Sequence, residues 1–174
     1  GTDITFSRNR NLVKELDDAN RIYWRNLYWY SEFQTVTKTE AGQPLGMFYG
    51  YQTEGIFTSQ EDILAHAVQV NNPNNDGKNL VDKRAGVWIG DVKFKDLNGD
   101  GVITTDDQTI IGNPNPDFTF GVNNSFSYGP FDLVVYLTGS YGADILNYSR
   151  VQIEGMTNVY ANQAATVFNR AQYN

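Results

Sequence analysis

The clearest pattern of hydrophobic and polar positions lies between residues 118 and 138, where apolar and polar residues alternate on both sides of a short turn at Gly129-Pro130. This alternation is the period of a β-strand with two different faces. The apolar positions are Phe118, Phe120, Val122, Phe126, Tyr128, Phe131, Leu133, Val135 and Leu137. Two strands of about ten residues with a very short turn have the dimensions of a transmembrane β-hairpin. A hairpin of a soluble β-sandwich gives the same alternation with its apolar side inward, so both hypotheses stay open.

Further segments predict strands, so that the expected fold class is mainly β, with antiparallel strands and hairpins. A turn around residues 41–44 would pair the β-branched run 33–39 with residues 45–57. Gly46, Gly50 and Gly55 within the latter segment indicate bulges or close backbone approaches. The remaining strand candidates are residues 2–7, the aromatic run 22–30 and residues 91–95.

Helical signals are few. Thr58 and Glu61 have the spacing of a capping box, and the apolar spacing after them predicts a helix from Ser59 to about Val68. A second helix is possible over residues 162–169, and residues 8–20 form either a short helical turn or an irregular loop. Residues 71–83 are polar and rich in Gly and Pro, which predicts a surface loop. His66 has no Cys or second His nearby, which favours a surface residue over a metal ligand.

A twelve-residue segment from Asp96 to Asp107 has the spacing of a calcium loop. Side-chain oxygens fall at its positions 1, 3, 5 and 12, and Gly101 at position 6 permits the sharp turn around an ion. The candidate ligands are Asp96, Asn98, Asp100, the carbonyl of Val102, Thr104 and Asp107. Aspartate stands at position 12 where the EF-hand has Glu, and its shorter arm should weaken the site. An acidic turn rich in Asx and Gly would have the same composition.

If calcium binds this loop, its role is expected to be structural, because the protein would fill every ligand position.

Composition limits the other functions. The net charge of −7, from 13 basic and 20 acidic residues, argues against a nucleic-acid partner. The chain has no cysteine and no apolar run long enough for a membrane-spanning helix. Its 3 Trp, 11 Tyr, 10 Phe and 16 Gly suit strands joined by turns.

Three stretches carry a resemblance to a known family: PLGMFYGYQTEGIF, GDVKFKDLNGDGVITTDDQTIIGNPNPDFTFG and FDLVVYLTGSYGADILN. In this order they resemble the late barrel region of the SusC/RagA-like TonB-linked outer-membrane transporters of Bacteroidetes. The resemblance implies a large barrel with an N-terminal plug, energised through TonB, and a SusD-like lipoprotein over its extracellular mouth. It also implies a cargo that is commonly oligosaccharide and sometimes peptide. Neither a plug nor a TonB box occurs in this chain, so we expect it to be part of a longer protein.

The resemblance also implies an orientation. Residues 1–8 would be the end of a barrel strand, 9–117 an extracellular loop region with the calcium-type loop 96–107, 118–141 a barrel hairpin, and 142–174 the next extracellular loop. Most of the segment would then lie outside the cell, attached to the outer membrane. The aromatic residues Trp24, Tyr28 and Trp29 are the candidate surface for a ligand or partner.

The sequence leaves two functions open and argues against a third. The leading hypothesis is part of a TonB-dependent importer. The alternative is a soluble, calcium-stabilised carbohydrate-binding β-domain that stacks sugars on Trp24, Tyr28, Trp29 or Trp88. An enzyme is not expected, because nothing in the sequence fixes the separation of candidate carboxylates such as Glu54, Glu61 and Asp62.

Overall fold

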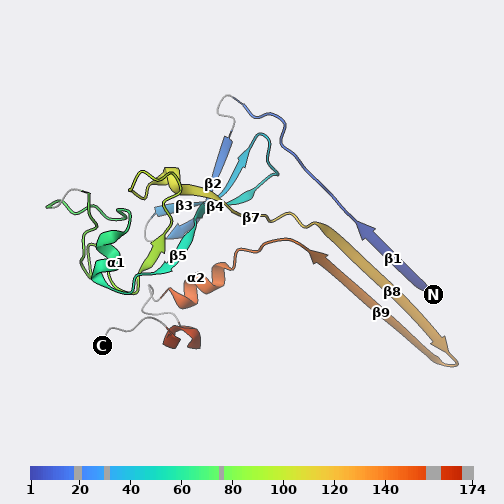
Figure 1. The fold of residues 1–174 in the computed structure, drawn as a ribbon. Coiled ribbons are helices and arrows are strands. Elements are labelled where there is room, and N and C mark those ends of the chain that lie inside the picture. Colours follow the sequence, from blue (N-terminus) through green and yellow to red (C-terminus); the bar gives the residue numbers. More distant parts are fainter. Residues whose placement is uncertain (18–20, 30–31, 75–76, 156–161, 170–174) are drawn as a thin grey trace. The chain divides into compact units, whose positions relative to one another are not determined.

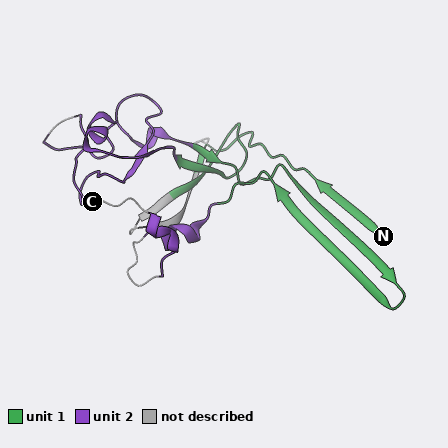
Figure 2. Ribbon diagram, turned by 60° about the horizontal axis from the view of Figure 1, so that its bottom comes forward, with its two compact units in different colours: residues 1–50, 110–145 green, residues 51–109, 146–174 purple. Residues whose placement is uncertain are grey.

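The structure is a computed structural model that describes residues 1–17, 21–29, 32–74, 77–155 and 162–169. For residues 23–29 and 32–34 the description is limited to the backbone. The chain divides into two compact units (Figure 2). Unit 1 consists of residues 1–50 and 110–145, and unit 2 of residues 51–109 and 146–174. The elements are mainly antiparallel strands, which confirms the predicted fold class.

Unit 1 contains a three-stranded antiparallel sheet with the order β1-β8-β9 (Figure 1). Its strands are β1 (Thr2–Ser7), β8 (Phe118–Tyr128) and β9 (Phe131–Tyr141). Strands β8 and β9 are paired along their full length, from Phe118 opposite Tyr141 to Tyr128 opposite Phe131. Gly129 supports the connecting turn with a positive φ of 58°. The predicted hairpin is therefore confirmed, with strands of 11 residues.

A second sheet has the order β2-β3-β4-β7. Its strands are β2 (Arg21–Trp29), β3 (Glu32–Glu40), β4 (Met47–Tyr51) and β7 (Gln108–Gly112). The predicted turn at residues 41–44 joins β3 to β4, which pair Thr37 with Phe48 and Lys38 with Met47. Residues 8–16 form no helix, which confirms the irregular-loop alternative for them. Val13 ties this loop to the turn, because its N–H donates to Gln43 O at 3.0 Å and its carbonyl accepts from Gly42 N at 2.8 Å.

Unit 2 contains the ribbon of β5 (Thr53–Ile56) and β6 (Val92–Phe94), together with the helix α1 (Gln60–Ala65). A register shift beside Gly55, whose φ is 133°, confirms a bulge at this glycine. The side chains of Phe57, Ile63 and Val87 are buried against one another and form the core.

Helix α1 is shorter than predicted, and its N-cap is Ser59 rather than Thr58. Ser59 Oγ accepts the N–H of Asp62 at 3.1 Å, while the Asp62 carboxylate accepts the N–H of Thr58 at 3.3 Å. The helix ends at Ala65 because the segment after it pairs elsewhere. Val68 donates to Gly101 O at 2.8 Å and accepts from Ile103 N at 2.9 Å, bonds that a continued helix would break.

Three short helical elements complete the described chain: η1 (Thr105–Asp107), α2 (Tyr148–Glu154) and η2 (Ala165–Asn169). The second predicted helix, over 162–169, is a 3₁₀ helix that begins only at Ala165. Helix α2 was not predicted from the sequence, although its N-cap residue Asn147 is a typical capping residue and accepts the N–H of Arg150 at 3.1 Å. None of the described helices has both the length and the apolar character that crossing a membrane requires.

Candidate functional site

The three-stranded sheet has one apolar and one polar face. Its register places Ile4 opposite Val122 and Val122 opposite Leu137, so the apolar positions of all three strands share one side. The apolar residues of this face are Ile4, Phe6, Phe118, Phe120, Val122, Phe126, Tyr128, Phe131, Leu133, Val135, Leu137 and Tyr141, and Thr2, Asn124 and Gly139 lie on the same side. Most of these side chains are exposed, for example Phe6 at 66% and Leu133 at 58%. A contiguous exposed apolar surface of this kind marks a contact with lipid or with another protein.

Aromatic rings occupy both ends of the apolar face. Tyr128 and Phe131 flank the turn, and at the opposite end the Phe118 ring stacks between Phe6 at 5.2 Å and Tyr141 at 5.3 Å. Strands of 11 residues extend over about 33–37 Å, and a tilt of about 45° reduces this to about the 25 Å of a lipid-facing band. These features favour the transmembrane hypothesis over a sandwich hairpin, whose apolar side would be covered.

The calcium-type loop has the tight winding that its spacing predicts. Both Asp96 oxygens accept loop amides, from Gly99 N at 2.7 Å and from Gly101 N at 2.8 Å. These two glycines have positive φ values of 77° and 83°. Asn98 Oδ1 accepts Asp100 N at 2.9 Å, and Asp100 Oδ1 accepts Val102 N at 2.8 Å. The side chains at positions 1, 3 and 5 therefore turn into the loop, as they do in a calcium loop and also in an Asx-rich turn.

Asp107 closes the base of this loop and is fully buried. Its Oδ2 accepts the N–H of Thr104 at 2.8 Å, and its Oδ1 accepts Leu97 N at 2.9 Å. Hydrogen bonds from backbone N–H groups hold the pKa of this carboxyl below its usual range; the largest effect comes from Thr104, followed by Leu97 and Asn98. Burial acts in the opposite direction and raises the pKa. Thr104 itself caps η1 by accepting the N–H of Asp106 at 3.2 Å.

The candidate ligands of the loop include amide, carbonyl and hydroxyl oxygens as well as carboxylates, so the loop suits only a cation that accepts neutral oxygen ligands. Among the described residues, no group of three or more His, Cys, Asp or Glu side chains is arranged to hold a metal ion. Calcium accepts amide and carbonyl oxygens as readily as carboxylates. A calcium ion here would need the oxygens of Asn98, Val102 and Thr104 in addition to the carboxylates.

Asn79 was not predicted from the sequence as an important residue. It is fully buried in unit 2 and forms the centre of a hydrogen-bond cluster. Its Oδ1 accepts Gln69 N at 2.6 Å and Val70 N at 3.2 Å. Its Nδ2 donates to the carbonyls of Ile63 at 2.9 Å and Ala67 at 3.0 Å, which are left without helical partners where α1 ends. The predicted surface loop 71–83 thus contains a buried anchor, and no local sequence signal distinguishes it from the other asparagines.

His66 is not a surface residue, contrary to the prediction. Its ring packs edge-on against Phe57, with 5.3 Å between centroids, and Nε2 lies 3.6 Å from a carboxylate oxygen of Glu54. Asp62, another carboxylate considered for catalysis, lies 2.6 Å from Lys93 Nζ, and this hydrogen bond lowers its pKa.

For the candidate ligand surface, Trp24, Tyr28 and Trp29, only the backbone is described. Strand β2 pairs Trp24 with Thr37, Tyr28 with Phe33 and Trp29 with Glu32. The side chains of Trp24, Tyr28 and Trp29 lie outside the described part of the structure, so their role stays a prediction. The fourth aromatic platform considered, Trp88, is half-buried, and Lys83 Nζ lies 5.1 Å from its ring centroid.

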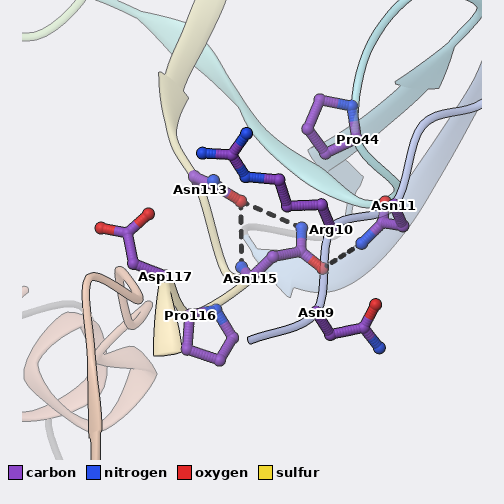
Figure 3. A pocket seen from close by; sticks show the side chains of 8 residues that line it. All are labelled: Asn9, Arg10, Asn11, Pro44, Asn113, Asn115, Pro116 and Asp117. Atoms are coloured by element: carbon purple, nitrogen blue, oxygen red, sulfur yellow. Dashed lines mark hydrogen bonds between the residues drawn. The ribbon is translucent and has the colours of Figure 1, made fainter. Parts of the chain in front are cut away.

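Unit 1 also contains a polar cavity of about 210 Å³, here called the asparagine pocket (Figure 3). It is lined by Asn9, Arg10, Asn11, Pro44, Asn113, Asn115, Pro116 and Asp117. The Asn115 side chain joins its walls, because Oδ1 accepts Asn11 Nδ2 at 2.9 Å while Nδ2 donates to Asn113 Oδ1 at 2.9 Å. The motif GNPNP was noted in the sequence, but the meeting of its asparagines with residues 9–11 follows only from the fold.

No protein-family model matches the chain. Three curated proteins of Formosa agariphila are similar to it. TonB-dependent receptor P3 is 32% identical over 152 residues, which are 87% of this chain and 14% of that protein. TonB-dependent receptor P26 is 33% identical over 111 residues, 64% of this chain and 10% of that protein. TonB-dependent receptor P39 is 28% identical over 182 residues, 92% of this chain and 16% of that protein.

The chain spans less than one fifth of the length of these relatives. Each relative is named as a receptor, which agrees with the prediction that the chain is not an enzyme. TonB-dependent receptors are outer-membrane proteins, whereas membership of the SusC/RagA-like group stays a prediction. The chain therefore belongs to the TonB-dependent receptors, as one segment of such a protein.

Proposed function

We propose that this chain is part of a TonB-dependent outer-membrane importer of oligosaccharides that works with a SusD-like surface lipoprotein. The observation that carries the proposal is the two-faced sheet β1-β8-β9 in a chain related to TonB-dependent receptors. Its exposed apolar face, about as tall as a lipid-facing band and ending in aromatic rings, fits a barrel wall. Its polar face, with side chains such as Thr5, Asn123 and Thr138, fits the lumen of such a barrel.

The experiment that tests this function uses the full-length receptor in its own bacterium. Deleting the gene should abolish growth on a limited set of oligosaccharides, and the intact gene should restore it. Deleting TonB should have the same effect on that cargo. Growth that is unchanged on every oligosaccharide, or lost only on peptides, would contradict the proposed cargo.

The partner is tested on the same strains. An affinity tag on the full-length receptor should co-purify a lipoprotein of the SusD type from the outer membrane. Alanine substitutions at Trp24, Tyr28 and Trp29 should reduce either this capture or cargo uptake, while the amount of receptor at the surface stays normal. If the substitutions lower surface abundance instead, these rings serve packing.

We also propose that loop 96–107 binds calcium as a structural ion. Support comes from three side chains that turn into the loop, from its two positive-φ glycines and from the buried Asp107 at its base. The ion would be held by Asp96, Asn98, Asp100, Asp107, the Val102 carbonyl and Thr104. The loop also pairs with Val68, so an ion in it would stabilise unit 2.

Calorimetric titration of the full-length receptor with calcium chloride, after chelator treatment, tests this proposal. The Asp100→Ala substitution should abolish binding at the loop. Asp106→Ala is the matched control, because Asp106 is an exposed neighbour outside the proposed ligand set. The loop is only an Asx-rich turn if heat of binding is absent at millimolar calcium, or is unchanged by Asp100→Ala.

A further inference from the structure

We propose that the asparagine pocket binds one ring of a neutral saccharide, and so forms a cargo contact at the loop end of the sheet β1-β8-β9. The inference rests on the proposed function of an oligosaccharide importer. It adds a specific binding site and a ligand charge, neither of which that function specifies.

One half of the pocket is fixed before any ligand arrives. Asn11 Oδ1 accepts Leu45 N at 2.7 Å, and Asn115 Nδ2 donates to Leu45 O at 3.0 Å. Asn113 is held through its backbone by Asp144, whose Oδ2 accepts Asn113 N at 2.7 Å and whose N–H donates to Asn113 O at 2.8 Å. Binding to such a preorganised wall costs little conformational entropy.

The other half of the pocket offers unused hydrogen-bonding groups. Within the described part of the chain, the side chains of Asn9, Arg10 and Asp117 make no hydrogen bond or ion pair. The backbone of Asp117 is nevertheless anchored, since its N–H donates to Tyr141 O at 2.8 Å. Its carboxylate lies against Gly142, where a Cβ would collide with it. A guanidinium, a carboxylate and an amide thus line one cavity (Figure 3).

These groups favour a neutral ligand with many hydroxyls. A hydroxyl both donates and accepts, so neighbouring hydroxyls of one ring can bind Asp117 and Arg10 together. An acidic ring would be attracted by Arg10 but repelled by Asp117, and a basic ring the reverse, so neither charge gains a net electrostatic advantage over a neutral ring. The cavity of about 210 Å³ is smaller than the roughly 300–1,000 Å³ of sites for drug-sized ligands, so it suits one ring of a longer chain.

The position of the pocket fits cargo that moves through a barrel. Ser7 and Thr119 are a cross-strand pair on the polar face of the sheet. Both line a hollow of about 180 Å³ that shares Asn9, Asn11 and Asn115 with the pocket. Phe118 of the apolar face also lines this hollow, so the pocket lies at the end of the sheet and adjoins its polar face, the side proposed to face the lumen.

Saturation-transfer NMR on the full-length receptor, purified in a detergent without a sugar head group, tests the inference. The probes are D-glucose, D-galactose and D-mannose, with D-glucuronate and D-glucosamine as charged rings. At least one neutral hexose should bind at millimolar concentration and should bind about tenfold more weakly to the Arg10→Ala/Asp117→Ala receptor. The matched control is Asp3→Ala/Arg8→Ala, which removes the same two charges from residues outside the pocket.

Three results would overturn the inference: no neutral hexose binds, binding survives the double substitution, or a charged ring binds more tightly. Uptake assays separate this failure from failure of the proposed function. If the receptor imports an oligosaccharide and the double substitution changes neither binding nor uptake, only the pocket assignment is wrong. If hexose binding depends on Arg10 and Asp117 but no oligosaccharide is imported, the proposed function is wrong and the pocket stands.

Discussion

The sheet β1-β8-β9 and the core of unit 2 use apolar side chains in opposite ways. In the sheet, large side chains such as Phe126 and Leu133 are more than half exposed. In unit 2, Phe57 and Ile63 are fully buried although the core around them is small. The sheet is held by ladder hydrogen bonds and needs a further apolar environment, whereas the described core of unit 2 buries its largest apolar side chains against one another and its buried Asn79 in hydrogen bonds. The comparison indicates that the apolar face of the sheet needs contacts from outside this chain, whereas the core of unit 2 is formed by residues of unit 2.

The largest expected effect concerns the self-contained region. Asn79→Ala would leave the amides of Gln69 and Val70 and the carbonyls of Ile63 and Ala67 without their side-chain partner. Each buried group left unsatisfied costs about 1–3 kcal/mol, so we expect unit 2 to lose about 3–5 kcal/mol. Hydrogen exchange of residues 51–109 in the full-length receptor should accelerate strongly. The exposed Asn74→Ala is the control and should change little; equal protection in both variants would refute the role of Asn79.

The second prediction separates the two faces of the sheet. Val135 and Tyr136 are neighbours near the middle of β9 on opposite faces. Val135→Arg should destabilise the receptor in the membrane by about 2–4 kcal/mol, since it would place a charge in lipid, while Tyr136→Arg should be tolerated. Heat-modified migration on gels measures folded barrel for both. A tolerated Val135→Arg would remove the lipid-facing assignment.

The third prediction concerns packing within the apolar face. Gly139 lies opposite Phe120, and a Cβ on it would come within 2.7 Å of that ring. Gly139→Val should therefore cost about 1–3 kcal/mol by overpacking. Phe120→Leu should recover part of this loss, which a double-mutant cycle in urea unfolding measures. Ser140→Val, on the polar face, is the control, and simple additivity of the two substitutions would contradict the contact.

The smallest effect should come from the pH dependence of the loop in unit 2. The pKa of Asp107 is lower in the folded protein than its ordinary value of 3.8. Its charged form thus stabilises the fold above that value, and this contribution is lost as the pH falls through the folded pKa. The protection of residues 96–104 against hydrogen exchange, corrected for the intrinsic rate at each pH, should fall below pH 3.8, and Asp107→Asn should remove most of that change while Asp106→Asn keeps it.

Local patterns predicted the strands and the loop winding well. The alternation around Gly129-Pro130 gave both faces of the hairpin, because side chains of a strand alternate whatever lies beside it. The spacing from Asp96 to Asp107 gave the loop, since its hydrogen bonds join residues at most ten positions apart. Helix α1 was predicted too long because its end depends on the pairing of Val68 with a segment more than thirty residues away.

The sequence by itself determined the elements whose forces act between near neighbours: the hairpin 118–141, the β3–β4 turn and the twelve-residue loop. Tertiary structure decided which distant groups meet, namely Asn79 with the end of α1, and Asn11 with Asn115. The reason is that a hydrogen bond between residues 104 positions apart leaves no periodic trace in composition or spacing. Arg10 and Asp117 line one cavity only in the folded chain. Likewise, only the sheet register places Ile4 on the apolar face of a hairpin that begins more than a hundred residues later.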